Sequence, residues 1–224
     1  MKLRYTEEFN LTTPSVALVQ TADKTHTAWA KRAMDIVMSA LALLLLWPLF
    51  LMIAVSIAVT SRGPVFFVQQ RVGLNGQTFK FFKFRSMYQD AEARRAEVET
   101  LSDRNGICLK VKRDPRITPI GRLLRRSSMD ELPQILNVLL GDMSLVGPRP
   151  ALVSEVAEYP DHAHRRHAVL PGITGLWQVS GRADIGFDEM IALDLDYVRR
   201  MSVPTDLVIL LRTVSAVLSG RGAY

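Results

Sequence analysis

The longest apolar stretch of the chain runs from Ile36 to Ser61 without a single charged residue. As an α-helix it would be about 39 Å long, whereas the hydrocarbon layer of a bilayer is about 30 Å thick. A buried helix of a soluble protein is rarely apolar over such a length. The pattern therefore predicts a membrane helix near the N-terminus.

A proline divides this apolar stretch. Pro48 follows Trp47 near its middle, and an interior proline removes one helix hydrogen bond and usually kinks the helix. Basic residues flank both ends, Lys31 and Arg32 before the stretch and Arg62 after it, so charge selects no orientation across a membrane. Two structures stay open: a kinked helix that spans the bilayer, and a hairpin that returns to the face it entered.

A shorter, alternating pattern follows the apolar stretch. Residues 65–68 and 79–84 are rich in valine and phenylalanine, and an Asn-Gly pair lies between them within residues 73–76. Two such runs around this turn chemistry predict a β-hairpin. In the second run Lys83 and Arg85 alternate with phenylalanines, so the two cations should share one face of the strand.

The densest candidate chemistry lies in the stretch Ser127–Pro150. It begins with two adjacent carboxylates, Asp130 and Glu131, and closes with Arg149 held between two prolines. Helical spacing predicts an amphipathic helix between these features, ended by Gly141. The apolar positions of that helix are Leu132, Ile135, Leu136 and Leu139. Carboxylates at a helix start with a stiffly mounted cation downstream suit phosphate chemistry.

The carboxylate pair also has a purely structural interpretation. Ser128 and Glu131 fit the capping box, in which the two side chains satisfy free backbone N–H groups at a helix start. Acidic residues in a first turn also complement the helix dipole. From spacing alone, capping and catalysis both remain open, and they can coexist if Asp130 is exposed while Glu131 caps.

Charge and length narrow the class of protein. The chain has 224 residues and a formal net charge of +6, so we expect an anionic partner such as a nucleotide phosphate, an anionic lipid or a nucleic acid. Cys108 is the single cysteine, which excludes an internal disulfide. No nucleic-acid recognition motif is present, and the apolar stretch needs a membrane, so a nucleic-acid binder is disfavoured.

Three other stretches carry less chemistry. Residues 88–102 are charged and contain alanine, which predicts a solvated helix. The histidines at 162, 164 and 167 lack the spacing of a helical zinc pair and lie among arginines, so metal binding there is disfavoured. Residues 207–218 form an apolar helix too short to span a membrane, which is either core or an interfacial helix.

Long motifs give the chain a family resemblance. The stretch DELPQILNVLLGDMSLVGPRP at residues 130–150 and the stretch PGITGLWQVSGR at residues 171–182 resemble those of the bacterial sugar transferases. These are monotopic phosphoglycosyl transferases that act on polyprenyl phosphate. The segments GPVFF and KFRSM in the predicted hairpin are also similar to the family. The resemblance covers about residues 31–224, and agreement over about twenty consecutive residues is far more specific than a short glycine motif.

The resemblance implies a fold and a location. It implies an α+β protein whose mostly helical cytoplasmic domain, residues 62–224, contains a short β-hairpin and interfacial helices. Residues 31–61 would form a re-entrant membrane hairpin that breaks at Pro48, and residues 1–30 a flexible polar tail. The implied location is the cytoplasmic face of a bacterial inner membrane, and the resemblance also admits a homo-oligomer.

The resemblance further implies an activity. The enzyme would transfer hexose-1-phosphate from a UDP-sugar to undecaprenyl phosphate, release UMP and so begin the repeat unit of an exopolysaccharide. Asp130 would be the nucleophile of a covalent intermediate, and Glu131 would act as a base or through Mg²⁺. The C-terminal ending favours galactose or glucose as the sugar. Asp130 and Glu131 are also the candidate ligands of the metal.

The resemblance assigns roles to other polar residues. The residues expected to contact phosphate are Arg125, Arg149, Lys83, Arg85 and Arg182, and those expected to support the site are Asp194, Gln134 and Tyr197. The alternative function is a membrane-tethered basic module that binds lipid or protein without catalysis. That module should retain its function in an Asp130→Asn variant, whereas a transferase should lose nearly all of it.

Overall fold

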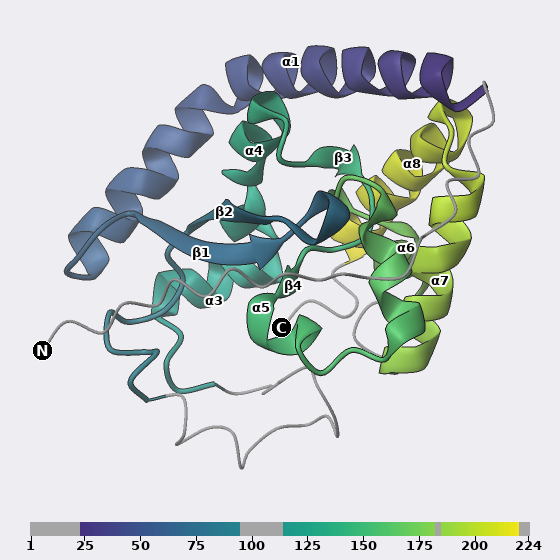
Figure 1. The fold of residues 1–224 in the computed structure, drawn as a ribbon. Coiled ribbons are helices and arrows are strands. Elements are labelled where there is room, and N and C mark those ends of the chain that lie inside the picture. The colour runs from purple at the N-terminus through teal and green to yellow at the C-terminus, as the bar shows by residue number, and fades with distance from the viewer. Residues whose placement is uncertain (1–22, 95–113, 182–184, 220–224) are drawn as a thin grey trace, which may run out of the picture.

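The computed structural model describes residues 23–94, 114–181 and 185–219. Its fold is mixed α+β, mostly helical with two small sheets, which confirms the predicted class (Figure 1). The described helices are α1 (Asp23–Thr60), α3 (Pro119–Arg126), α4 (Gln134–Leu140), α5 (Val153–Val156), α6 (Leu176–Ser180), α7 (Phe187–Arg200) and α8 (Val203–Ser219). The described strands are β1 (Phe66–Val72), β2 (Thr78–Phe84), β3 (Ser144–Val146), β4 (Ala151–Leu152) and β5 (Gly172–Thr174).

Helix α1 is the longest element, and from Ala28 to Thr60 it is long and apolar enough to cross a membrane. It contains Pro48 and bends along its course over the rest of the molecule (Figure 1). Many of its large apolar side chains are exposed, as a surface facing lipid would be. They include Val37, Leu41, Leu44, Leu45, Trp47, Leu51, Met52, Val55 and Val59. The helix begins at Asp23, inside the stretch expected to be a polar tail.

The N-terminal half of α1 is fixed to the domain by charged side chains. Arg32 donates from Nη1 to the Val138 carbonyl (2.6 Å) and from Nη2 to the Leu139 carbonyl (3.0 Å), so it supplies donors to carbonyls at the C-terminal end of α4. Lys31 donates to the Val146 carbonyl (3.0 Å) and pairs with Asp206, which is wholly buried. Lys31 and Arg32 therefore attach α1 to the rest of the domain, in addition to flanking the apolar stretch.

The C-terminal half of α1 packs against the same domain through its core. Phe50, Ile53 and Ile57 are buried in one hydrophobic cluster with Phe84 of β2 and Leu124 of α3. Burying apolar side chains of this size stabilises the contact by about 1.5–3 kcal/mol each. Both halves of the bent helix thus contact a single body.

The predicted hairpin is confirmed. Strands β1 and β2 pair antiparallel from Phe66 opposite Phe84 to Val72 opposite Thr78. At the turn, Asn75 has φ 53° and Gly76 has φ 79°, the left-handed conformation that asparagine and glycine adopt most readily. Strand β4 pairs with the other edge of β1 and completes a three-stranded sheet.

The free edge of β2 is covered by one side chain. Asn137 of α4 is completely buried; its Oδ1 accepts from the Phe82 N–H (3.0 Å) and its Nδ2 donates to the Lys80 carbonyl (2.6 Å). The amide therefore replaces the backbone of a neighbouring strand. It joins the helix that follows the carboxylate pair to the strand that carries Lys83.

An Asn137→Leu variant should unfold more easily, because it leaves two partly buried backbone groups of β2 without their partners. We expect its free energy of unfolding to fall by about 2–4 kcal/mol, measured by denaturant unfolding in detergent. Gln77→Leu is the matched control, since Gln77 is exposed on the same hairpin. Equal stability of the two variants would show that the amide does not hold the strand.

The predicted helix start near Ser128 is wrong. Residues Met129–Glu131 form a 3-10 turn, and α4 begins only at Gln134. Pro133 has no N–H to bond the Met129 carbonyl, and its ring obstructs that carbonyl, which disfavours an α-helix that begins at Met129. Ser128 has φ 57° and its side chain caps nothing, so the expected capping box does not form. Gly141 ends α4 with φ 96°, as predicted.

Two further expectations have different outcomes. Residues 89–94 form turns instead of the expected helix, and the remainder of that prediction lies outside the described residues. Helix α8 contributes to the core through Ile209, which is buried, while Leu207, Leu211 and Val214 are exposed. One side of α8 therefore belongs to the core, and the expectation that its other side lies on a bilayer stays a prediction.

Candidate active site

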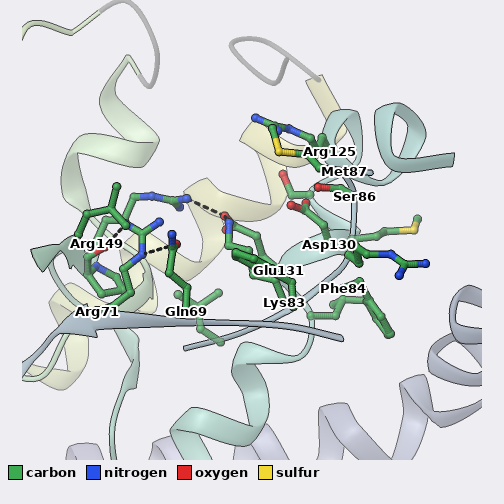
Figure 2. A pocket seen from close by; sticks show the side chains of 18 of the residues that line it. Gln69, Arg71, Lys83, Phe84, Ser86, Met87, Arg125, Asp130, Glu131 and Arg149 are labelled. Carbon is green, nitrogen blue, oxygen red and sulfur yellow. Dashed lines mark hydrogen bonds and ion pairs between the residues drawn. The ribbon is translucent and has the colours of Figure 1, made fainter. Parts of the chain in front are cut away.

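A pocket of about 970 Å³ collects most of the predicted site residues. It lies between the hairpin, the end of α3, the 3-10 turn and the loop after β3, and Figure 2 shows it from close by. Four expected phosphate-binding cations line it together with both carboxylates: Lys83, Arg85, Arg125 and Arg149 with Asp130 and Glu131. Segments far apart in the sequence therefore meet at the carboxylate pair.

Glu131 is held by two cations. Lys83 Nζ and Arg149 Nη2 each lie 2.8 Å from the same atom, Glu131 Oε1. Although burial opposes ionisation, Arg149 and Lys83 together hold the pKa of Glu131 well below its usual range. The Glu131 carboxylate is consequently charged at neutral pH and aligns both cations. The ionised carboxylate has no proton to donate, and its lowered pKa makes it a weak base, so Glu131 is poorly suited to either role in proton transfer.

Asp130 has a different environment. In a 3-10 turn adjacent side chains point about 120° apart, and in Figure 2 Asp130 points away from Arg149, toward the part of the pocket that holds Ser86 and Arg125. It is 7% exposed and has no hydrogen bond or ion pair to any residue that the structure describes. Burial, and to a lesser degree the neighbouring Glu131, raise its pKa, while Lys83, Arg125 and Arg149 oppose the rise.

The backbone around Arg149 is fixed at successive carbonyls. Those of residues 146, 148, 149 and 150 all accept hydrogen bonds from other parts of the chain. The donors are Lys31 Nζ (3.0 Å) and Tyr197 OH (2.9 Å) to Val146, Gly172 N (2.9 Å) to Pro148, Arg166 Nη2 (2.9 Å) to Arg149, and Arg71 Nη1 (3.1 Å) to Pro150. The Arg149 side chain therefore extends from a rigid loop toward Glu131.

Arg166 is the central residue of this support. It is 2% exposed and donates to Tyr159 OH (2.8 Å), to the Arg149 carbonyl and to Asp194 Oδ2 (2.5 Å). Asp194 is wholly buried, so its ion pair with Arg166 lies in the interior and not at the surface. Burial raises the pKa of Asp194 to about 6, against the opposing charge of Arg166. Asp194 is not in the pocket lining itself, but it contacts Arg166, which lines the pocket.

An Arg166→Lys variant should retain the charge but lose the planar fork that makes three contacts at once. We expect kcat to fall about tenfold and the free energy of unfolding to fall by about 1–3 kcal/mol, with little change in the donor KM. Steady-state kinetics and thermal unfolding provide the measurement, and exposed Arg165→Lys is the adjacent control. A change confined to stability would make Arg166 structural only.

The other predicted residues lie in different places. Arg85 lines the pocket, but its Nη2 also donates to the Ser61 carbonyl (2.8 Å) just after α1. Gln134 is buried at the start of α4. Tyr197 lies with Lys31 and Asp206 beneath the loop, donating to Asp206 Oδ1 (2.8 Å). Arg182 lies outside the described residues.

Sequence reasoning missed Arg71 and Arg166. Arg71 lines the pocket and contacts Pro150, and the sequence carried one usable signal for it, the alternation of β1 that places it on the same face as Phe67. Arg166 lay among histidines and arginines that suggested only repulsion of a metal. His167 is buried and stacks on Tyr159, and burial together with Arg166 lowers its pKa to about 4.

The carboxylates are compatible with Mg²⁺ delivered by a substrate. No group of three histidine, cysteine or acidic side chains suited to a metal occurs among the described residues. Mg²⁺ at phosphoryl-transfer sites is commonly bound by one or two carboxylates, and substrate phosphates and water complete the coordination. Asp130, which has no partner in the described part of the chain, meets this requirement, and Glu131 lies next to it.

The structure thus combines a helix of membrane length with a pocket of cations and carboxylates, which suits the binding of an anionic substrate at a membrane. The family model for bacterial sugar transferases matches residues 26–220. The chain therefore belongs to the bacterial sugar transferase family, and the resemblance seen in its motifs is confirmed.

Three relatives illustrate this membership. Exopolysaccharide production protein ExoY of Rhizobium meliloti (strain 1021) is 41% identical over 199 residues, covering 87% of this chain and 88% of that protein. Galactosyl transferase CpsE of Streptococcus agalactiae serotype III (strain NEM316) is 45% identical over 195 residues, covering 87% and 43%. UDP-glucose:undecaprenyl-phosphate glucose-1-phosphate transferase of Xanthomonas campestris pv. campestris is 44% identical over 205 residues, covering 87% and 40%. The chain thus spans less than half the length of the last two.

Proposed function

We propose that the protein transfers glucose-1-phosphate or galactose-1-phosphate from a UDP-sugar to undecaprenyl phosphate, releasing UMP and starting an exopolysaccharide unit. The observation that carries this proposal is the contrast within the carboxylate pair. Glu131 is neutralised by Lys83 and Arg149, while Asp130 faces the pocket without a partner among the described residues. The names of the three relatives support the donor, the acceptor and the pathway class.

The first step uses Asp130 as a nucleophile. An Asp130 oxygen forms a bond to the β-phosphorus of the UDP-sugar, and the bond from that phosphorus to the bridging oxygen breaks, so UMP leaves. The product is an acyl phosphate in which the phosphosugar is bonded to the Asp130 carboxylate. Splitting one difficult displacement into two in this way is the usual benefit of a covalent intermediate. Arg149, Lys83 and Arg125 surround the phosphates and stabilise their charge.

The second step regenerates the enzyme. A phosphate oxygen of undecaprenyl phosphate attacks the same phosphorus, and the bond to Asp130 breaks, which returns the free carboxylate and releases the lipid diphosphate sugar. Glu131 remains ionised and keeps Lys83 and Arg149 aligned through both steps. Mg²⁺, when bound by Asp130, Glu131 and the diphosphate, supplies further neutralisation of negative charge.

The anchor is proposed to be re-entrant and to lie in a bacterial inner membrane, with the domain on the cytoplasmic face. Lys31 and Arg32 near one end and Ile57 near the other contact the same domain, which supports both ends of α1 lying on one side. Cysteines introduced at exposed Ala28 and Arg62, in a Cys108→Ser background, test this with an impermeant thiol reagent. Labelling from opposite sides would establish a spanning helix.

The activity is tested by UMP release from a panel of UDP-sugars. The full chain in lipid nanodiscs would be supplied with undecaprenyl phosphate and Mg²⁺. We expect release and a lipid-linked product with UDP-glucose or UDP-galactose. A phosphosugar adduct on the Asp130 peptide should be detected by mass spectrometry when the lipid is omitted. Folded protein that binds vesicles but releases no UMP would favour the non-catalytic module.

A further inference from the structure

The first residues of β1 expose apolar side chains on both faces of the strand. Phe66, Phe67 and Val68 are 45%, 42% and 49% exposed, and successive side chains of a strand point to opposite faces. A strand end facing water normally has at least one polar face. This end of the hairpin is therefore suited to contact with an apolar partner.

Four residues of this region form an apolar rim of the pocket: Pro64, Phe66, Phe67 and Tyr88 all line the cavity that contains Asp130. The rim is continuous with the membrane helix. The Phe66 ring stacks on Phe84 with centroids 5.4 Å apart, and Phe84 packs on Phe50 of α1 at 5.3 Å. A path of apolar contacts thus runs from α1 to the wall of the pocket.

The rim also lies next to the reacting groups. Phe67 is paired with Lys83 across the hairpin, so their side chains share one face as direct neighbours. Lys83 in turn contacts Glu131, beside Asp130. A ligand whose phosphate lies at these groups would place the adjoining part of the molecule on the exposed Phe67 ring.

We propose that the apolar rim binds the isoprene units of the acceptor lipid that adjoin its phosphate. This inference rests on the proposed function, which supplies a polyisoprenyl phosphate as acceptor. The acceptor is the substrate whose phosphate is attached directly to hydrocarbon, whereas the phosphates of a UDP-sugar join a sugar to a nucleoside. Continuity of the rim with α1 gives the remaining hydrocarbon a route toward the bilayer.

Phe67→Ser tests the proposal, since the ring is exposed and its loss should leave the fold intact. We expect the KM for undecaprenyl phosphate to rise about tenfold, with the donor KM unchanged. The same rise should occur with geranyl phosphate, which carries only the isoprene units nearest the phosphate. Leu74→Ser is the matched control, because Leu74 is also an exposed apolar residue of the hairpin but does not line the pocket.

Three results would overturn the proposal. A higher KM for the UDP-sugar would mean that the Phe67 ring binds the sugar or the uracil base of the donor. A rise in KM with undecaprenyl phosphate but not with geranyl phosphate would mean that the rim serves membrane attachment. Unchanged KM values for both substrates would mean that the rim has no role in binding them. Direct calorimetric binding of geranyl phosphate separates this proposal from the transfer reaction. Suppose that the wild type binds geranyl phosphate, that Phe67→Ser weakens this binding about tenfold, and that no UDP-sugar gives UMP. The lipid-binding role of the rim would then stand, and only the proposed transfer reaction would be rejected.

Discussion

Asp130→Asn should lower UMP release by at least about a thousandfold, because an amide cannot form the acyl phosphate with the phosphosugar. The loss should occur in a folded protein. Burial raises the pKa of Asp130, so at neutral pH its charge costs stability, and an uncharged amide of the same shape removes that cost. We therefore expect a melting temperature equal to or above that of the wild type.

Exposed Asp188→Asn is the control for Asp130→Asn, since it removes an equal charge from α7, outside the pocket lining. Both variants should be assayed for UMP release with and without undecaprenyl phosphate, and for the adduct on the residue-130 peptide. Substantial turnover by Asp130→Asn would remove this carboxylate from the chemistry. The membrane-tethered binding module would then become the better account of the pocket.

Glu131→Gln should damage both stability and activity. It leaves Lys83 and Arg149 close together around a neutral amide, and breaking this partly buried pair of charge-assisted contacts should cost about 1–3 kcal/mol of unfolding free energy. Because both phosphate-binding cations lose their common anchor, kcat should fall at least about a hundredfold. Chemical denaturation and UMP release measure the two effects, with exposed Glu158→Gln as the control.

The stability difference between wild type and Glu131→Gln should depend on pH. Since the folded pKa of Glu131 lies below its ordinary value of 4.5, its contribution is complete above pH 4.5 and is lost as the pH falls toward the folded pKa. The two proteins should therefore approach each other in stability below about pH 4.5. A difference that grows on acidification would contradict the assigned pairing.

Local patterns predicted the elements that local chemistry determines. The valine and phenylalanine runs with Asn75 and Gly76 predicted the hairpin, because a turn of this kind is specified within a few residues. Gly141 was identified as the end of α4 for the same reason. The start of α4 was missed because an apolar stripe does not mark the first helical residue: Pro133 cannot bond the Met129 carbonyl, which accepts from Leu132 in the 3-10 turn instead.

The candidate site could be predicted only in part. Motif resemblance supplied Lys83, Arg125 and Arg149, and the structure brings all three into one pocket. Their partners could not be predicted, since contacts between residues far apart in sequence depend on the packed fold. Arg166 bonds a carbonyl 17 residues away and Lys31 one 115 residues away. No periodicity encodes such pairings.

The attachment of α1 to the domain has a consequence for modularity. Removing the helix would expose the final carbonyls of α4 and leave buried Asp206 without the cation of Lys31. The anchor is therefore not an exchangeable tether: a chimera with an unrelated membrane segment would lose these bonds even if it reached the same bilayer. Residues 23–60 and the carboxylate pocket should accordingly be engineered and purified as one unit.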